Sequence, residues 1–121
     1  MDVLLVDDSR VMRGLVRRTL RQAGFDLGNV VEAENGKEAL DTLAKGQKFD
    51  LVLSDWNMPE MSGIELLAKL QADGVRVPFG FVTSESTPEM RERARQAGAL
   101  FLIAKPFTAE SFQAALAPVL G

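Results

Sequence analysis

Five short apolar runs alternate along this chain with segments of helical period, and this alternation restricts the fold more than any other feature. Such a pattern is typical of βα units around a parallel sheet. The predicted strands are Val3–Val6, Val30–Ala33, Leu51–Ser54, Phe79–Thr83 and Leu100–Ala104. The predicted helices are Arg10–Ala23, Gly36–Lys45, Gly63–Ala72, Pro88–Ala97 and Ala109–Val119.

The pattern predicts a single α/β domain over residues 1–121, with a five-stranded parallel sheet and five helices. The first, third and fifth strands are apolar throughout, as expected when helices cover both faces of the sheet. Asn35 and Ser62 each have a glutamate three residues later, and Thr87 precedes a proline, so capping signals support three helix starts. Gly80 inside the fourth strand indicates a close backbone approach.

Cysteine and histidine are both absent, so the chemistry of this chain is limited to carboxylates and lysine. Disulfides, zinc fingers, thiolate nucleophiles and imidazole bases are excluded, and no histidine can accept a phosphoryl group. The net charge of -3 gives no general argument for binding nucleic acid or a membrane. The first apolar run is too short for a signal sequence or a membrane span, and we therefore expect a cytoplasmic protein.

Ionisable residues stand just past the ends of three predicted strands. Asp7 and Asp8 follow the first, Asp55 the third and Lys105 the fifth. Parallel strands present their carboxyl ends at one edge of the sheet, where open α/β sheets bind ligands. Three neighbouring carboxylates need a positive charge among them, and oxygen donors without histidine or cysteine suit Mg²⁺.

Asp55 stands alone on its strand and is the better candidate for a nucleophile that forms an aspartyl phosphate. Transfer to it requires in-line positioning and neutralised phosphoryl oxygens more than a base. Lys105 and the metal would supply positive charge, and Thr83 would donate its hydroxyl. Singly, each residue has a structural alternative: Asp8 or Ser9 caps the first helix, Asp55 lies in a turn, Thr83 reflects β propensity and Lys105 is a surface charge. Their joint placement favours a site.

At these residues the chain resembles the receiver domains of bacterial two-component response regulators, most closely the stand-alone chemotaxis type. The resemblance covers essentially all 121 residues and implies the strand order 2-1-3-4-5. The motifs that carry it are Val6-Asp7-Asp8-Ser9, Ser54-Asp55-Trp56-Asn57-Met58-Pro59-Glu60-Met61-Ser62-Gly63, Val82-Thr83-Ser84-Glu85 and Ala104-Lys105-Pro106-Phe107.

The resemblance implies that Asp55 accepts a phosphoryl group from a phosphohistidine of a sensor kinase or phosphotransfer protein. Asp8, Asp55 and the backbone carbonyl of Asn57 would bind Mg²⁺, and Asp7 would act through water. The protein would catalyse only its own phosphorylation and dephosphorylation, so it would not be a classical enzyme. A monomer and a dimer formed on phosphorylation both remain open.

Further roles follow from the same resemblance. Thr83 and Lys105 would contact the phosphoryl group and thereby shift the fourth helix, the fifth strand and the fifth helix. These three elements would form the face that contacts a downstream protein. Asn57 and Glu85 would tune hydrolysis, and the Lys105–Pro106 bond would be cis. Receivers usually carry tyrosine or phenylalanine where this chain has Leu102, and the adjacent Phe101 faces the other side of the sheet. The output switch is therefore expected to be weaker or to use another path.

Two helices are rich in arginine. The first carries Arg10, Arg13, Arg17, Arg18 and Arg21, which fall in one arc opposite apolar residues. This arc is either a solvated basic face or a docking surface for an acidic patch on the phosphodonor. On the fourth helix, Arg91, Arg93 and Arg95 either pair with neighbouring glutamates or form part of an output face. Trp56 is expected to be half-exposed.

Two other functions are alternatives to the phosphoacceptor. A phosphohydrolase with an aspartyl nucleophile usually has a second aspartate two residues later, where this chain has Asn57. A degenerate receiver would bind partners without phosphorylation. Leu102 is compatible with that alternative, but the complete set of acids, threonine and lysine argues against it.

Overall fold

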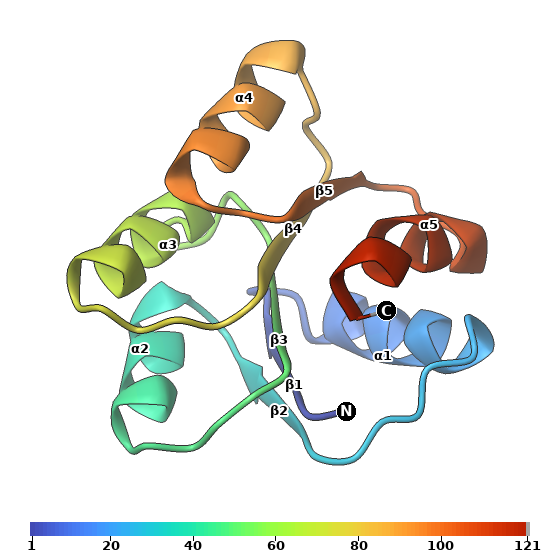
Figure 1. The fold of residues 1–121 in the computed structure, drawn as a ribbon, viewed down its shortest axis with the longest axis horizontal. Coiled ribbons are helices and arrows are strands. Elements are labelled where there is room, and N and C mark those ends of the chain that lie inside the picture. Colours follow the sequence, from blue (N-terminus) through green and yellow to red (C-terminus); the bar gives the residue numbers. More distant parts are fainter. Residues whose placement is uncertain (121) are drawn as a thin grey trace.

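The computed structural model describes residues 1–120, and Gly121, the last residue of the predicted domain, lies outside them. Its single sheet has five parallel strands in the predicted order, β2-β1-β3-β4-β5 (Figure 1). The strands are β1 (Val3–Val6), β2 (Val30–Ala33), β3 (Leu51–Ser54), β4 (Phe79–Thr83) and β5 (Phe101–Ala104). The helices are α1 (Arg10–Gln22), α2 (Gly36–Ala44), α3 (Gly63–Ala72), α4 (Pro88–Ala97) and α5 (Ala109–Leu120).

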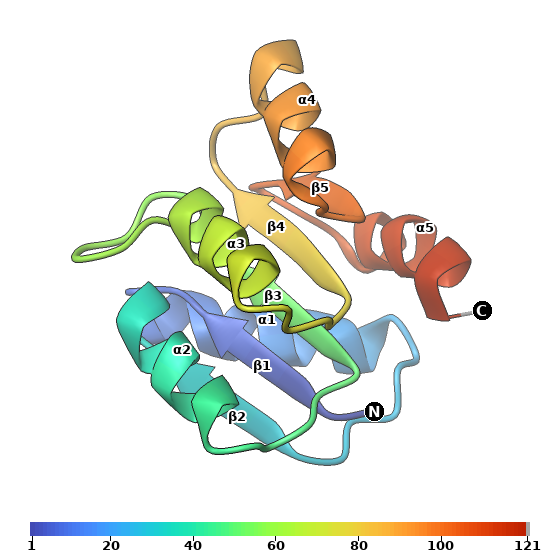
Figure 2. The same cartoon turned by 60° about the vertical axis from the view of Figure 1, so that its left-hand side comes forward.

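Helices cover both faces of the sheet, as predicted. Helices α1 and α5 lie on one face, and α2, α3 and α4 lie on the other (Figures 1 and 2). Alternate strand residues enter two separate cores, because successive side chains of a strand point to opposite faces. Leu4 and Val6 pack in the core beneath α2–α4, whereas Val3 and Leu5 pack beneath α1 and α5.

The three central strands are fully buried, but β5 is not. The prediction that β5 is covered on both faces is wrong for Phe101, Leu102 and Ala104, which are half-buried because β5 pairs only with β4. The predicted strand was also one residue too long. Leu100 lies before β5 and is 53% exposed.

The predicted helix starts are confirmed by their caps. The hydroxyl of Ser62 accepts the Glu65 N–H while the Glu65 carboxylate accepts the Ser62 N–H, which forms a capping box at α3. At α2 the Asn35 side chain accepts the Glu38 N–H, and at α4 the Thr87 hydroxyl accepts the Met90 N–H, so both helices begin with a single side-chain cap. Helices α1 and α2 end one residue earlier than predicted, and α5 ends one residue later.

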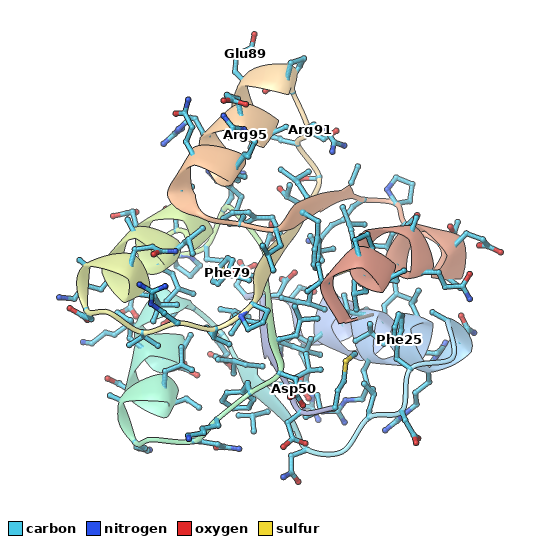
Figure 3. All side chains as sticks on the ribbon, viewed as in Figure 1. Phe25, Asp50, Phe79, Glu89, Arg91 and Arg95 are labelled. Carbon is cyan, nitrogen blue, oxygen red and sulfur yellow. The ribbon has the colours of Figure 1, made fainter. Side chains whose placement is uncertain are left out.

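The predicted close approach at Gly80 is present, but a side chain makes it rather than a backbone segment. Gly80 and Phe101 are partners in the β4–β5 register, and the Phe101 ring lies against the Gly80 α-carbon. In Figure 3, Phe79 lies in the interior, whereas Arg91 and Arg95 lie at the surface of α4. Within residues 1–120 no helix is both long and apolar enough to cross a bilayer.

Candidate functional site

The backbone extends the parallel ladder one residue past the strands and thereby brings their following residues to one edge. The Asp7 N–H donates to the Ala33 carbonyl at 3.1 Å, and the Asp55 N–H donates to the Val6 carbonyl at 2.8 Å. At the far side, the Lys105 N–H donates to the Thr83 carbonyl at 2.8 Å. The residues that follow β1, β3 and β5 therefore project from the same edge of the sheet.

Three carboxylates meet at this edge. One oxygen each from Asp7, Asp8 and Asp55 lies within 4.8 Å of the other two. Asp7 is buried and Asp8 is exposed, so the cluster opens to solvent on the Asp8 side. Magnesium takes one or two carboxylates and keeps several waters, and this oxygen-only, half-open set of donors fits that ion.

Lys105 bridges two of these acids. Its ammonium nitrogen lies 3.1 Å from Asp7 Oδ2 and 3.2 Å from Asp55 Oδ2. Burial raises the pKa of the Asp55 carboxyl above its ordinary value, Lys105 lowers it in part, and the charge of Asp7 raises it again. One amine therefore does not fully compensate the acids, and the cluster favours a further cation.

Ser9, rather than Asp8, caps the first helix. The Ser9 hydroxyl accepts the Met12 N–H at 3.1 Å, and the Ser9 N–H in turn donates to Asp7 Oδ1 at 2.8 Å. This turn fixes Asp7 and leaves Asp8 at the exposed side of the acid cluster. The capping alternative for Asp8 is therefore wrong.

Thr83 and Asn57 both contact Glu85, and within residues 1–120 none of the three forms a hydrogen bond with the three acids. Thr83 is fully buried at the end of β4, and its hydroxyl lies 3.4 Å from the Glu85 nitrogen. The Asn57 amide donates to Glu85 Oε1, also at 3.4 Å. Asn57 and Glu85 are both exposed, so this pair links the β3–α3 and β4–α4 loops at the surface.

Comparison with known proteins decides the family. The model of the response regulator receiver domain matches residues 3–117. This chain belongs to that family. A chemotaxis protein CheY homolog from Campylobacter jejuni is 41% identical over the whole chain and 93% of its own length.

Solved receiver structures agree with the assignment. Chemotaxis protein CheY4 of Vibrio cholerae is 36% identical, with 98% of each chain covered and a TM-score of 0.82. The signal receiver domain of the putative response regulator NarL from Mycobacterium tuberculosis is 29% identical, with 99% of this chain and 96% of that chain covered and a TM-score of 0.84. This chain is thus a receiver of the chemotaxis type in two-component systems.

The arginine arc of this receiver is not one continuous exposed face. The Arg13 side chain is only 8% exposed, and its Nε lies 2.7 Å from Glu32 Oε1. Arg17 is half-buried, and its Nη2 lies 2.8 Å from Glu32 Oε2. The prediction missed Glu32, which lies on the edge strand β2 and forms ion pairs with both arginines. Arg10, Arg18 and Arg21 remain exposed.

The exposed side of α1 is apolar as well as basic, which corrects the predicted orientation of the helix. Val11 is 82% exposed and Leu15 is 42% exposed. Together with Gly14 they line a shallow hollow that Arg10 and Arg18 border. Val16 and Leu20 turn inward instead. We call Arg10, Val11, Leu15, Arg18 and Arg21 the α1 surface.

Trp56 is buried, so the prediction that it is half-exposed is wrong. It is 6% exposed, and its ring centroid lies 4.7 Å from that of Phe81. The guanidinium carbon of Arg93 lies 5.5 Å from the Trp56 centroid. Because the backbone N–H of Trp56 also donates to Asp55 Oδ1 at 2.7 Å, one residue links the acid cluster to α4. Arg93 therefore packs over Trp56, whereas within residues 1–120 the α4 arginine that pairs with a glutamate is Arg95, with Glu92.

Leu102 occupies the place where receivers usually carry an aromatic residue. It pairs with Phe81 in the β4–β5 register and packs against the core beneath α4. Phe101 packs with the opposite core, so it does not replace the missing aromatic ring, as the sequence predicted. The Leu102 carbonyl accepts a hydrogen bond from Arg91 Nη1 at 3.2 Å, which ties α4 to β5.

Proposed function

We propose that this receiver is a phosphorylatable switch in which Asp55 accepts a phosphoryl group from a phosphohistidine of a sensor kinase or phosphotransfer protein. The observation that carries the proposal is the position of the Lys105 ammonium between Asp7 and Asp55, with Asp8 in the same cluster. Acids and an amine in this arrangement suit transfer of a dianionic group, which requires neutralised oxygens.

Asp8, Asp55 and the backbone carbonyl of Asn57 would hold Mg²⁺, and Asp7 would contact it through water. The bound ion would neutralise phosphoryl oxygens during transfer. The Asp55 carboxylate forms a bond to phosphorus as the phosphorus–nitrogen bond of the donor breaks, and the imidazole nitrogen keeps the electron pair. Lys105 offers its ammonium to one phosphoryl oxygen, and Thr83 offers its hydroxyl to another.

The output would reach a downstream protein through α4, β5 and α5. Thr83 and Lys105 lie at the ends of β4 and β5, so their contacts with the phosphoryl group would displace these ends. Two shallow hollows on this face share Arg91, Phe101 and Leu102 and offer both apolar area and charge. Asn57 and Glu85 would set the lifetime of the aspartyl phosphate. We propose a cytoplasmic protein that acts by protein contact as a monomer or a phosphorylation-dependent dimer.

The phosphodonor would dock on the α1 surface. Of the arginines predicted to dock the phosphodonor, Arg13 and Arg17 already pair with Glu32, whereas Arg10 and Arg21 are exposed. The arginines that remain on the surface flank Val11 and Leu15, so an acidic helical partner with an apolar stripe would match this surface.

Trp56 emission tests the proposed chemistry, because Trp56 directly follows Asp55, its backbone N–H donates to the Asp55 carboxylate, and it is the only tryptophan of the sequence. We expect a saturable change on addition of Mg²⁺ and a further change with beryllofluoride. Asp55→Asn should abolish the second change, and a small acyl phosphate should phosphorylate wild type only. A wild-type protein that responds to neither reagent would contradict the proposal and favour a phosphorylation-independent binding module. Steady phosphate release from small phosphoesters would instead favour a hydrolase.

A further inference from the structure

We propose that Arg13 is a positioning residue for the metal site. Its guanidinium fixes the peptide that joins Asp7 to Asp8 and thereby sets the place of the Asp8 carboxylate. This inference rests on the proposed function, because it concerns the same acid cluster. Arg13 touches neither phosphorus nor the predicted metal and would act through the backbone.

Arg13 is held in an unusual place for its charge. Arginine is rarely buried without partners, yet the side chain of Arg13 is only 8% exposed. The other arginines of residues 1–120 are half-buried or exposed. Its burial is compensated on one side by the Glu32 carboxylate and on the other by a backbone carbonyl of the site, which accepts from Nη1.

That carbonyl belongs to Asp7, which has a partner at every polar atom. The Asp7 N–H donates to Ala33, Oδ1 accepts from the Ser9 N–H, and Oδ2 contacts Lys105. The carbonyl lies beyond the end of β1, and Arg13 supplies its donor. Removal of Arg13 would leave a polar backbone group beside the acids without this partner.

Asp8 depends on this arrangement more than its neighbours do. Within residues 1–120 the Asp8 carboxylate has no hydrogen bond or ion pair, whereas Asp7 and Asp55 are each held by Lys105. The backbone therefore sets where Asp8 stands. The peptide between Asp7 and Asp8 carries the carbonyl that Arg13 binds, so rotation of this peptide would move the Asp8 side chain away from Asp55.

Arg13 and two of the acids line the same small cavity. The cavity of about 10 Å³ lies behind the cluster, and its polar lining consists of Asp7, Arg13, Ser54 and Asp55. Because Arg13 and the two acids line the same cavity, a substitution at Arg13 would alter the immediate surroundings of the acid pair. Removal of a group that orients a metal ligand in this way typically lowers the metal affinity about 10–100-fold.

Two variants separate the positioning role from a merely structural one. Arg13→Met removes both hydrogen bonds, whereas Glu32→Gln removes the ion pair and leaves the Arg13 bond to Asp7 intact. Both should lower the stability of the Mg²⁺-free protein. We expect Arg13→Met to weaken Mg²⁺ binding about tenfold, measured by Trp56 emission and by the shift of the thermal midpoint with Mg²⁺. Glu32→Gln should change that affinity less than about twofold, because the acid turn keeps its donor.

Equal Mg²⁺ affinities for Arg13→Met and wild type, or equal losses in Arg13→Met and Glu32→Gln, would overturn the inference. If Arg13→Met does not fold, Arg13→Lys decides, because lysine keeps the charge but cannot hold Asp7 and Glu32 as a fork. We expect it to bind Mg²⁺ measurably more weakly than wild type, and wild-type affinity would contradict the inference. A wild-type protein without saturable Mg²⁺ binding would instead reject the proposed function itself.

Discussion

The ring of Phe101 occupies the space that any side chain at Gly80 would need. A methyl group at residue 80 would lie 2.1 Å from Phe101 Cε1 and 2.2 Å from Cζ. The two residues are register partners on β4 and β5, so the large residue of one strand packs over the small residue of the next. The edge strand is held against the sheet partly by this contact.

Gly80→Ala should therefore destabilise the fold by about 1–3 kcal/mol, since overpacking forces the ring or the strand to move. Urea unfolding followed by circular dichroism measures the change. In a Phe101→Ala background the same substitution should have little effect, because the ring that it would meet is gone. An equal loss in both backgrounds would show that the contact does not explain the glycine.

Asp55→Asn should stabilise the Mg²⁺-free protein at neutral pH. Burial raises the pKa of the folded Asp55 carboxyl above its ordinary value of 3.8. At pH values between the unfolded and the folded pKa, the folded state therefore binds more protons than the unfolded state. The stability that protonation of Asp55 contributes is present at low pH and is lost as the pH rises through the folded pKa. Thermal unfolding from pH 4 to 7 with a chelator should show that the thermal midpoint of the variant increases relative to that of wild type as the pH rises. A constant difference would contradict this assignment.

Lys105→Met should strengthen Mg²⁺ binding even though it removes a residue of the site. The ammonium contacts Asp7 and Asp55 and competes with a second cation for their charge. Loss of one positive charge at this range should tighten Mg²⁺ binding about tenfold. Titration of Trp56 emission measures the affinity, and Lys105→Arg serves as the charge-retaining control. Weaker binding in Lys105→Met would show that the lysine organises the acids more than it competes for them.

Arg93→Gln should loosen Trp56 without affecting the acids. The guanidinium lies over the indole ring, and such contacts contribute about 0.5–1 kcal/mol at exposed sites. We expect a red shift of the emission and greater quenching by acrylamide. Arg95→Gln is the matched control, because Arg95 pairs with Glu92 on the surface of the same helix. Identical spectra for Arg93→Gln and wild type would exclude a contribution from this contact.

Charge reversal on the α1 surface should slow phosphotransfer from a protein donor. The double variant Arg18→Glu and Arg21→Glu should lower the association rate by about tenfold or more at low salt, with a smaller effect at high salt. Transfer from a small acyl phosphate should be unchanged, since neither residue lies in the acid cluster. Equal losses with both donors would indicate damage to the site rather than to docking.

The strands and the edge of the sheet that holds the acids follow from local signals. Hydrophobic runs, caps and the residues just past the runs placed Asp7, Asp55 and Lys105 together, because parallel strands leave little freedom for their ends. The errors arose where a partner distant in sequence decided the outcome. Trp56 is buried because Phe81 and Arg93 enclose it, and Arg13 is buried because Glu32 and the Asp7 carbonyl receive it. Helical periodicity carries no information about such partners.

The bond between Lys105 and Asp7 joins residues that are 98 positions apart. A chain that ends before β5 would carry all three carboxylates without their amine, and would resemble a simple chelator. Under the proposed function, competence to receive a phosphoryl group would arise only after the fifth βα unit has been synthesised and has docked. Incomplete chains on the ribosome would not be phosphorylated, and signalling would therefore require a completely folded domain.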